Sequence, residues 1–279
     1  MWIRGKLLGK GSFGFVSLAT FINGAAADHE EELDNDDNDN GVVLAVKSAE
    51  FSYSKELQKE RELFAELDGN PYVIRCFGAD VTEEDGVILY NIFLEYASGG
   101  SLRNYIHTEA LNLDDIKWIT KSLLLGLREI HSKGIVHCDI KPDNILLVLN
   151  EERGNYLVKI ADLGLAIRMK DRKGKTSSEL RGTSIYMAPE SFLKGEYSYG
   201  VDIWALGCCV FEMIIKKPIA DFDGDYVSVG DNKQQRVIQL PPGLPNDAVD
   251  FLKKTWKKNP ESRWSADRLL SHPFVDIED

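Results

Sequence analysis

Four short segments of the chain concentrate residue types that can carry out chemistry. Residues 137–144 read His-Cys-Asp-Ile-Lys-Pro-Asp-Asn, which places a carboxylate, a lysine and an amide within six residues. Asp-Leu-Gly follows at 162–164, and a lysine ends the run Ala-Val-Lys at 45–47. Residues 9–14 read Gly-Lys-Gly-Ser-Phe-Gly, a pattern whose backbone can approach phosphates closely. The glycine pattern is the feature that first suggests a phosphate ligand.

The glycine pattern of residues 9–14 has two interpretations. A Rossmann crossover has the same spacing, but there the last glycine opens a helix and an acidic residue follows about 20 positions later. Here residues 15–19 continue as Phe-Val-Ser-Leu-Ala, an aromatic and β-branched run typical of a strand. The context therefore favours a β-hairpin whose backbone can close over phosphates, and disfavours a dinucleotide-binding crossover.

Lys47 ends an apolar run, residues 42–46, that predicts a buried strand. A buried ammonium group is costly without a partner of opposite charge. Residues 54–67 show the apolar periodicity of a helix, and Glu60 on that helix can supply the partner. We therefore expect the strand and the helix to bring these two charges together.

The remaining elements divide the chain into a strand-rich first third and a helical remainder. Strand-like runs occur at 7–21 and 87–96. The helices expected after them are 114–130, 202–216 and 247–258. Asp114 is the expected N-cap of the first of these helices. This division predicts an α+β protein with two lobes joined near residues 95–99.

The four segments at 9–14, 45–47, 137–144 and 162–164 occur in the order of a known set of sequence motifs. Ala-Pro-Glu at 188–190 completes that set. In these residues the chain resembles the eukaryotic protein kinases from Leu7 to Phe274. Residues 2–16 and 92–102 resemble more specifically the mitogen-activated protein kinase kinase kinases, particularly the plant forms. Lys141, two residues after the aspartate of the 137–144 loop, is the serine/threonine pattern of the family.

The resemblance implies a bilobal protein kinase fold. Its N-lobe, about residues 1–96, would hold a five-stranded antiparallel sheet and one helix. A hinge at about 95–99 would lead into a mainly helical C-lobe, about residues 97–279. In the family, ATP lies between the lobes.

The resemblance also assigns catalytic roles, because phosphoryl transfer depends on positioning and on neutralising negative charge. Lys47 would hold the α- and β-phosphates and be oriented by Glu60, which the family pattern selects over the competing Glu62. Asp139 would accept or orient the proton of the substrate hydroxyl. Lys141 would neutralise the γ-phosphate.

The same resemblance places the nucleotide and its cation. Asn144 and Asp162 would hold Mg²⁺, with Mn²⁺ as an alternative, because both offer oxygen ligands. The residues expected to line the ATP site are Leu8, Gly9, Gly11, Gly14, Val16, Ala45, Lys47, Glu95, Ala97 and Leu146. Side chains of this set would sandwich the adenine, and backbone groups at 95 and 97 would hydrogen-bond its edge.

Other polar residues are expected to be structural. His137 is expected to bond to backbone rather than act as a base. Asp202 is expected to cap the helix that begins there and to bond the 137–144 loop. Glu190 and Arg263 match the buried ion pair of the family, and Thr183 is placed to contact the catalytic aspartate and lysine.

Two positions depart from the family pattern. Leu163 replaces the usual Phe of the magnesium-binding tripeptide, which is an apolar swap of similar volume. Cys138 replaces the Arg that normally binds an activation-loop phosphate through a bidentate pair. We therefore hypothesise that activity depends less on such a phosphate. The basic residues around 176–178 could bind a phosphate locally or could simply form a solvated face.

The resemblance predicts transfer of the ATP γ-phosphate to serine or threonine hydroxyls of a protein, here a downstream mitogen-activated protein kinase kinase. The alternative is a pseudokinase that scaffolds signalling partners. Such proteins usually lack Lys47, Asp139 or Asp162, and all three are present.

The acidic residues of the chain are unevenly spread. The formal net charge is −12, and eight of the thirteen residues at 28–40 are acidic. Only one of the thirteen is apolar, so we expect a solvated loop insertion. Residues 36–41 imitate the start of an EF-hand loop, but Lys47 occupies the twelfth position, where that loop needs a bidentate Glu. The acidic balance disfavours nucleic acid and anionic membranes as partners.

The four cysteines, Cys76, Cys138, Cys208 and Cys209, are too few and too irregularly spaced for a disulfide framework. We expect reduced thiols and no disulfides. No signal peptide is visible, and the longest apolar run, 203–211, is too short to cross a bilayer. These features predict a cytoplasmic or nuclear protein.

Overall fold

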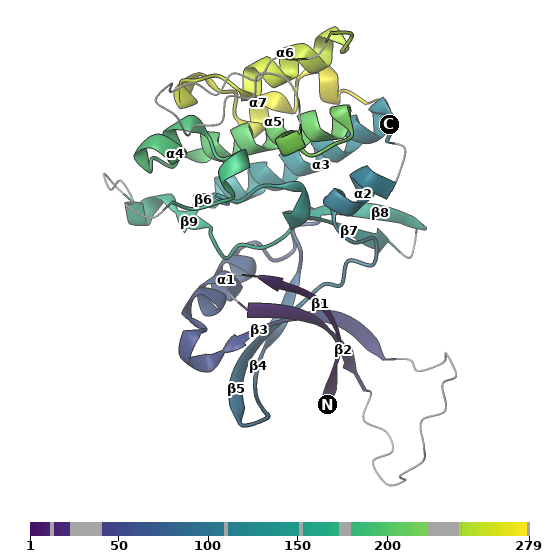
Figure 1. Ribbon diagram of the computed structural model, residues 1–279, viewed down its shortest axis with the longest axis vertical. Coiled ribbons are helices and arrows are strands. Elements are labelled where there is room, and N and C mark those ends of the chain that lie inside the picture. Colours follow the sequence, from purple (N-terminus) through teal and green to yellow (C-terminus); the bar gives the residue numbers. More distant parts are fainter. Residues whose placement is uncertain are drawn as a thin grey trace. The chain divides into compact units, whose positions relative to one another are not determined.

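The chain divides into two compact units in the computed structural model (Figure 1). The small unit comprises residues 1–68 and 75–97, and the large unit comprises residues 69–74 and 98–279. The structure describes residues 1–11, 14–22, 41–108, 111–150, 153–172, 180–221, 240 and 242–277. The predicted acidic insertion at 28–40 and residues 176–178 therefore lie outside the described residues.

The small unit is built on a five-stranded sheet, which confirms the expected fold. All neighbouring strands are antiparallel, in the order β1-β2-β3-β5-β4. The strands are β1 (Trp2–Gly11), β2 (Gly14–Phe21), β3 (Val42–Glu50), β4 (Cys76–Glu84) and β5 (Val87–Leu94). Strand β3 is the central strand, and six consecutive residues of it, 44–49, are buried. The central strand therefore buries Lys47 together with its apolar neighbours.

Side chains link the two edge strands of this sheet. Trp2 on β1 donates its indole N–H to Asp80 on β4 at 3.0 Å. Arg4 on β1 makes two hydrogen bonds of 2.8 Å to the carboxylate of Glu84 on β4. The Arg4 guanidinium also donates to Ser48 and Asn91, at 2.9 Å each. The sheet is therefore curled enough for its two edge strands, β1 and β4, to share one polar network.

One helix, α1 (Lys55–Glu66), packs on the sheet of the small unit and contacts β4 and β5 (Figure 1). It coincides with the helix predicted at 54–67. Its buried residues are Leu57, Glu60, Leu63 and Phe64. Their spacing places the single carboxylate among them on the same face as the apolar side chains.

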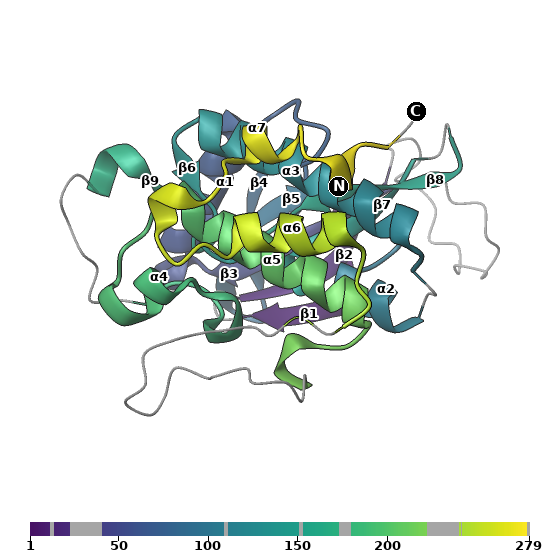
Figure 2. The same cartoon turned by 90° about the horizontal axis from the view of Figure 1, so that it is seen from above.

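The large unit is mainly helical. Its helices are α2 (Leu102–Thr108), α3 (Leu113–Ser132), α4 (Pro189–Lys194), α5 (Tyr199–Ile215), α6 (Asn246–Thr255) and α7 (Ala266–Leu269). Residues 201–213 of α5 are all buried, as expected of a helix that is apolar on every side. Helix α5 packs against α3 and α6 (Figures 1 and 2). No helix in the described parts of the chain is long and apolar enough to span a bilayer.

Two predicted helix caps are wrong. Helix α3 is capped by Asn112, whose side chain accepts from the N–H of Asp115 while Asp115 accepts from the N–H of Asn112. The expected cap, Asp114, lies inside the first turn. Helix α5 begins before Asp202 and is capped by Ser198. In both cases an earlier side-chain oxygen satisfies the exposed N–H groups, so the helix starts ahead of its apolar run.

Short strands in the large unit carry the two loops that hold the predicted catalytic residues. The strands are β6 (Ile135–Val136), β7 (Ile145–Asn150), β8 (Asn155–Ile160) and β9 (Ile167–Arg168). Strand β6 pairs with β9, and β7 pairs with β8. Residues 137–144 run from β6 to β7, and residues 161–166 run from β8 to β9. The two strand pairings therefore anchor both loops at both ends.

Candidate active site

The predicted site residues divide between the two units. The small unit contains Leu8, Gly9, Gly11, Gly14, Val16, Ala45, Lys47, Glu60, Glu95 and Ala97. The large unit contains Asp139, Lys141, Asn144, Leu146 and Asp162.

Lys47 and Glu60 form a buried ion pair in the small unit. The Lys47 Nζ donates to both carboxylate oxygens of Glu60, at 2.9 and 2.7 Å. Lys47 is 8% exposed and Glu60 is 1% exposed, whereas Glu62 lies on the exposed side of α1. The structure therefore selects Glu60 over Glu62. A buried ion pair is weak evidence of a stabilising role, because desolvation offsets much of the attraction. The pair instead fixes an ammonium group at the centre of the sheet.

The glycine pattern of residues 9–14 lies where β1 and β2 pair as an antiparallel hairpin, as predicted. Gly11 and Gly14 are paired across the hairpin, and Ser12 and Phe13 between them lie outside the described residues. Gly14 has φ +134°, and a Cβ there would lie 2.0 Å from the carbonyl oxygen of Ser48. A Cβ on Gly9 or Gly11 would meet no atom within 4 Å. The two glycines therefore leave open space beside the backbone, which fits a loop that admits phosphates.

The other predicted nucleotide-binding residues of the small unit lie on the strands of the same sheet or directly after β5. Val16 on β2 is opposite Lys47 on β3, and Ala45 on β3 is opposite Leu94 on β5. Glu95 follows β5, and its N–H donates to the carbonyl of residue 75 at 2.9 Å. The register therefore places an apolar residue, Val16, directly beside the buried lysine.

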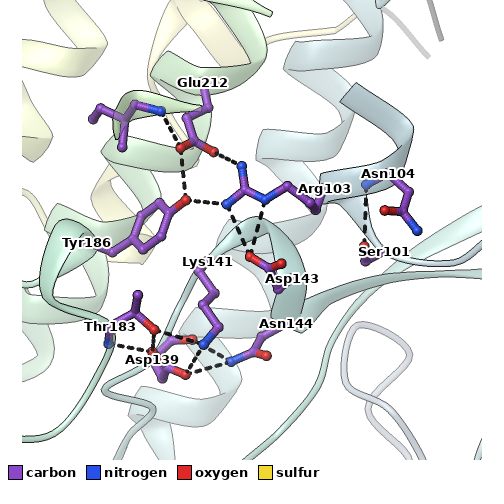
Figure 3. A network of polar contacts seen from close by, with 11 residues as sticks. Ser101, Arg103, Asn104, Asp139, Lys141, Asp143, Asn144, Thr183, Tyr186 and Glu212 are labelled. Atoms are coloured by element: carbon purple, nitrogen blue, oxygen red, sulfur yellow. Dashed lines mark hydrogen bonds and ion pairs between the residues drawn. The ribbon is translucent and has the colours of Figure 1, made fainter. Parts of the chain in front are cut away.

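The carboxylate of Asp139 has partners on both of its oxygens (Figure 3). One of its oxygens accepts from both the N–H and the hydroxyl of Thr183, at 2.8 Å each. The other accepts from the side-chain amide of Asn144 at 3.0 Å and lies 2.8 Å from the Nζ of Lys141. Lys141 also donates to the hydroxyl of Thr183 at 2.8 Å. These contacts confirm the predicted position of Thr183 and hold the carboxylate in one orientation beside an ammonium group.

Asn144 and Asp162 are brought together by the backbone. The N–H of Ala161 donates to the carbonyl of Asn144 at 2.9 Å, which places the two loops side by side. Asp162 has φ +63°, a left-handed conformation that is uncommon for a residue with a side chain and is often found at functional sites. Its carboxylate accepts from the N–H of Gly164 at 3.2 Å. Asn144 uses its amide nitrogen on Asp139, so its amide oxygen is the atom it can offer to a cation.

The donor set fits a cation that arrives with a nucleotide. The described residues contain no group of three or more His, Cys, Asp or Glu side chains that could hold a metal on their own. Mg²⁺ is usually bound by one or two carboxylates, with phosphates and water completing its shell. One carboxylate from Asp162 and one amide oxygen from Asn144 match that mode.

The residues predicted to be structural do brace the loops. The ring of His137 bonds the carbonyl of Ala161 at 3.0 Å and accepts from the N–H of Asp139 at 3.2 Å. Asp202 accepts from the N–H groups of His137 and Cys138, at 2.9 Å each, and from the ring of His131 at 2.9 Å. The predicted bond from Asp202 to the loop is therefore confirmed, although Asp202 does not cap its helix.

Glu190 and Arg263 form the predicted buried pair in the large unit. Two guanidinium nitrogens donate to the two carboxylate oxygens at 2.5 and 2.7 Å. The Arg263 side chain is completely buried and also donates to the carbonyls of Lys257 and Gly200. It therefore ties the start of α4 to the first turn of α5 and to the segment that follows α6.

A further polar network, which the sequence reasoning missed, lies beside the catalytic loop (Figure 3). It joins Arg103 on α2, Asp143 in the loop, Tyr186 after Thr183, and Glu212 on α5. Arg103 and Glu212 are 109 residues apart in sequence. No local pattern of residue types relates positions so distant.

Comparison with known proteins identifies the family. The sequence model of the protein kinase domain family matches residues 2–275 of the chain. The chain is 38% identical to mitogen-activated protein kinase kinase kinase 20 of Arabidopsis thaliana, over 99% of this chain and 79% of that protein. It is 39% identical to mitogen-activated protein kinase kinase kinase 18 of the same plant, over 98% of this chain and 77% of that protein. It is 32% identical to the serine/threonine-protein kinase BCK1/SLK1/SSP31 of Saccharomyces cerevisiae, over 100% of this chain and 18% of that protein.

Proposed function

The chain belongs to the protein kinase family, and on that premise we propose that its substrate is a mitogen-activated protein kinase kinase. It is an ATP-dependent protein serine/threonine kinase that also uses a divalent cation. The observation that best supports this activity is the fixed position of the Asp139 carboxylate, which contacts Thr183, Asn144 and Lys141. The substrate proposal is supported by the names of the relatives, which are mitogen-activated protein kinase kinase kinases from a plant.

The large-unit residues can act directly on the acceptor hydroxyl. The fixed carboxylate of Asp139 would orient a serine or threonine hydroxyl and take its proton as that oxygen bonds to the γ-phosphorus. The bond from the γ-phosphorus to the β–γ bridging oxygen breaks in the same transfer, and ADP leaves. Lys141 would neutralise negative charge on the transferring γ-phosphoryl group. Its bond to the hydroxyl of Thr183 keeps the ammonium group beside the carboxylate, so orientation and neutralisation occur together.

The nucleotide would be held through its phosphates. Lys47, oriented by Glu60, would bind the α- and β-phosphates, and the backbone at Gly9 and Gly11 would lie over them. We propose Mg²⁺ as the cation, with Asp162 as the carboxylate ligand. When bound, Mg²⁺ neutralises phosphate charge and aligns the nucleotide for transfer.

A phosphotransfer assay tests this function. Wild-type protein, Mg²⁺-ATP and a panel of catalytically inactive mitogen-activated protein kinase kinases would be compared with a generic basic protein. We expect the kinase kinases to be phosphorylated on serine or threonine, and Asp139→Asn to lower the rate at least about 1,000-fold. Asp267→Asn, an exposed change of the same chemistry, serves as the matched control.

The outcomes of this assay separate activity from substrate class. Equal rates for wild type and Asp139→Asn would overturn the mechanism. Turnover of the generic protein alone would overturn the substrate class but leave the kinase activity standing. Replacing Mg²⁺ with Mn²⁺ in the same assay tests the choice of cation, and a higher rate with Mn²⁺ would contradict it.

We also propose that the protein works in the cytoplasm or nucleus. All four cysteines are free thiols, three of them buried, which suits a reducing compartment. Imaging of the tagged protein in its own cells would test this, and a signal confined to a secretory compartment would contradict it.

A further inference from the structure

Arg103 on α2 binds side chains from three other elements at once (Figure 3). One nitrogen donates to Glu212 on α5 at 2.9 Å. A second donates to the hydroxyl of Tyr186, and to Asp143 at 3.1 Å. The third donates to Asp143 at 3.3 Å. A planar guanidinium can satisfy three such partners, whereas the ammonium of a lysine is a single point of charge.

Glu212 is the fixed, buried end of this network. Its side chain is 1% exposed, and it accepts from Arg103, from the hydroxyl of Tyr186 at 2.9 Å and from the N–H of Ile219 at 2.6 Å. A carboxylate so buried needs a counter-charge, and Arg103 supplies it. Burial raises the pKa of Tyr186, so its phenol stays protonated and continues to donate to Glu212.

The two segments that Arg103 contacts are the same two that hold the catalytic carboxylate. Asp143 belongs to the short 3₁₀ helix Pro142–Asn144, and its neighbour Asn144 donates to Asp139. Tyr186 belongs to the 3₁₀ helix Ser184–Tyr186, whose N-cap is Thr183, and Thr183 donates twice to Asp139. One guanidinium therefore connects both supports of one carboxylate, although it does not touch that carboxylate itself.

We propose that Arg103 is a positioning residue for phosphoryl transfer, which by binding Asp143 and Tyr186 together sets the two supports of Asp139 relative to each other. The inference rests on the proposed kinase activity. Activity then depends on the simultaneous binding of Asp143 and Tyr186 by Arg103, which we call the Arg103 bridge, and not only on the positive charge at position 103. A lysine at position 103 would still neutralise Glu212, but all its donors lie on one nitrogen, so it could not direct separate nitrogens at Glu212, the loop and the 184–186 segment.

A double-mutant cycle on turnover tests the bridge. The variants are Arg103→Lys, Asp143→Ala and the two combined, with Arg153→Lys in the exposed β7–β8 turn as the control. We expect each single variant to lower kcat about 10- to 100-fold, because small misplacements of catalytic groups are costly. The KM for ATP and the Tm of Arg103→Lys should stay close to wild type. The combined variant should be no slower than the slower single variant, because both remove one bridge.

Each other outcome overturns the proposal. Losses that multiply in the combined variant would show that the two residues act independently. A lower Tm with normal kcat would make Arg103 purely structural, and a higher KM for the protein substrate alone would make it a substrate contact. If Arg103→Lys fails to fold, Tyr186→Phe removes only the hydroxyl and should show the same loss of kcat at normal Tm. An inactive wild type would overturn the proposed function and this inference with it, whereas an active wild type with any of these results overturns the inference alone.

Discussion

Lys47 and Glu60 hold each other in the interior of the small unit, with the ammonium of one bonded to both carboxylate oxygens of the other. The lysine lies on the central strand and the glutamate on the buried face of α1. A helix and a sheet thus meet through a charge pair as well as through apolar packing. The orientation of the lysine depends on where the helix lies.

Glu60→Gln should therefore impair use of ATP. The amide keeps the shape of the carboxylate but leaves a buried ammonium group without a counter-charge. We expect kcat/KM for ATP to fall about 10- to 100-fold and the free energy of unfolding to fall by about 3 kcal/mol. Steady-state kinetics and denaturant unfolding measure the two effects.

Glu62→Gln is the matched control for that experiment. It makes the same chemical change two residues away on the exposed side of α1, and should alter unfolding by less than about 0.5 kcal/mol. If Glu62→Gln impaired ATP use as much as Glu60→Gln, the assignment of the partner would be wrong.

Arg263 should matter for stability and not for chemistry. Arg263→Met leaves the carboxylate of Glu190 buried without its partner, so we expect a loss of about 3–5 kcal/mol in the free energy of unfolding. At a temperature where the variant is folded, its kcat should stay within about twofold of wild type. Arg268→Met, an exposed change on α7 that removes a contact with the ring of Trp264, should cost about 1 kcal/mol or less. A large loss of kcat without a loss of stability would contradict the structural role.

The link between Arg4 and Glu84 should give the small unit a stability that depends on pH. Hydrogen bonds from Arg4 lower the pKa of Glu84 below its ordinary value of 4.5. The folded state therefore favours the ionised carboxylate. This contribution is fully present above pH 4.5 and is lost as the pH falls through the lower pKa of the folded state.

Glu84→Gln should accordingly lower the Tm at neutral pH. The difference from wild type should shrink as the pH falls below 4.5, because wild type then also loses the charge. Glu83→Gln, an exposed neighbour on β4, should change the Tm little throughout. A difference for Glu84→Gln that stays constant with pH would contradict the charge-based contribution.

Local patterns were sufficient to predict the elements that carry Lys47 and Glu60, but not the short strands β6 to β9 that flank the loops of the large-unit site. The apolar run before Lys47 and the periodicity of residues 54–67 correspond to β3 and α1. Strand β4 was not predicted from the local pattern, because all of its residues are half-buried or exposed and its apolar pattern is weak. The helix caps were wrong, because a cap depends on which nearby oxygen reaches the free N–H groups and not on where the apolar run begins.

The site was predicted through family motifs more than through spacing alone. Asp139, Lys141 and Thr183 meet as expected, since the motifs already encode that geometry. Arg103 carries no motif, and its partner Glu212 is far away in sequence and in a different helix. Only the tertiary structure, in which α2 contacts the loop and Arg103 reaches Glu212 on α5, reveals that relationship.

Cys138 should make activity tolerant of phosphatase treatment. It lies directly before Asp139, with φ +68° and a buried side chain, in place of an arginine that could bind an activation-loop phosphate. A thiol cannot form a bidentate, charge-assisted pair with a phosphate. We expect phosphatase to lower the activity of wild type by less than roughly threefold, and that of Cys138→Arg by a much larger factor. In the variant the new guanidinium can bind the activation-loop phosphate, so that removal of the phosphate removes an interaction that supports activity. Loss of nearly all wild-type activity, with recovery on rephosphorylation, would show that other cations anchor the phosphate and that Cys138 does not free the enzyme from it.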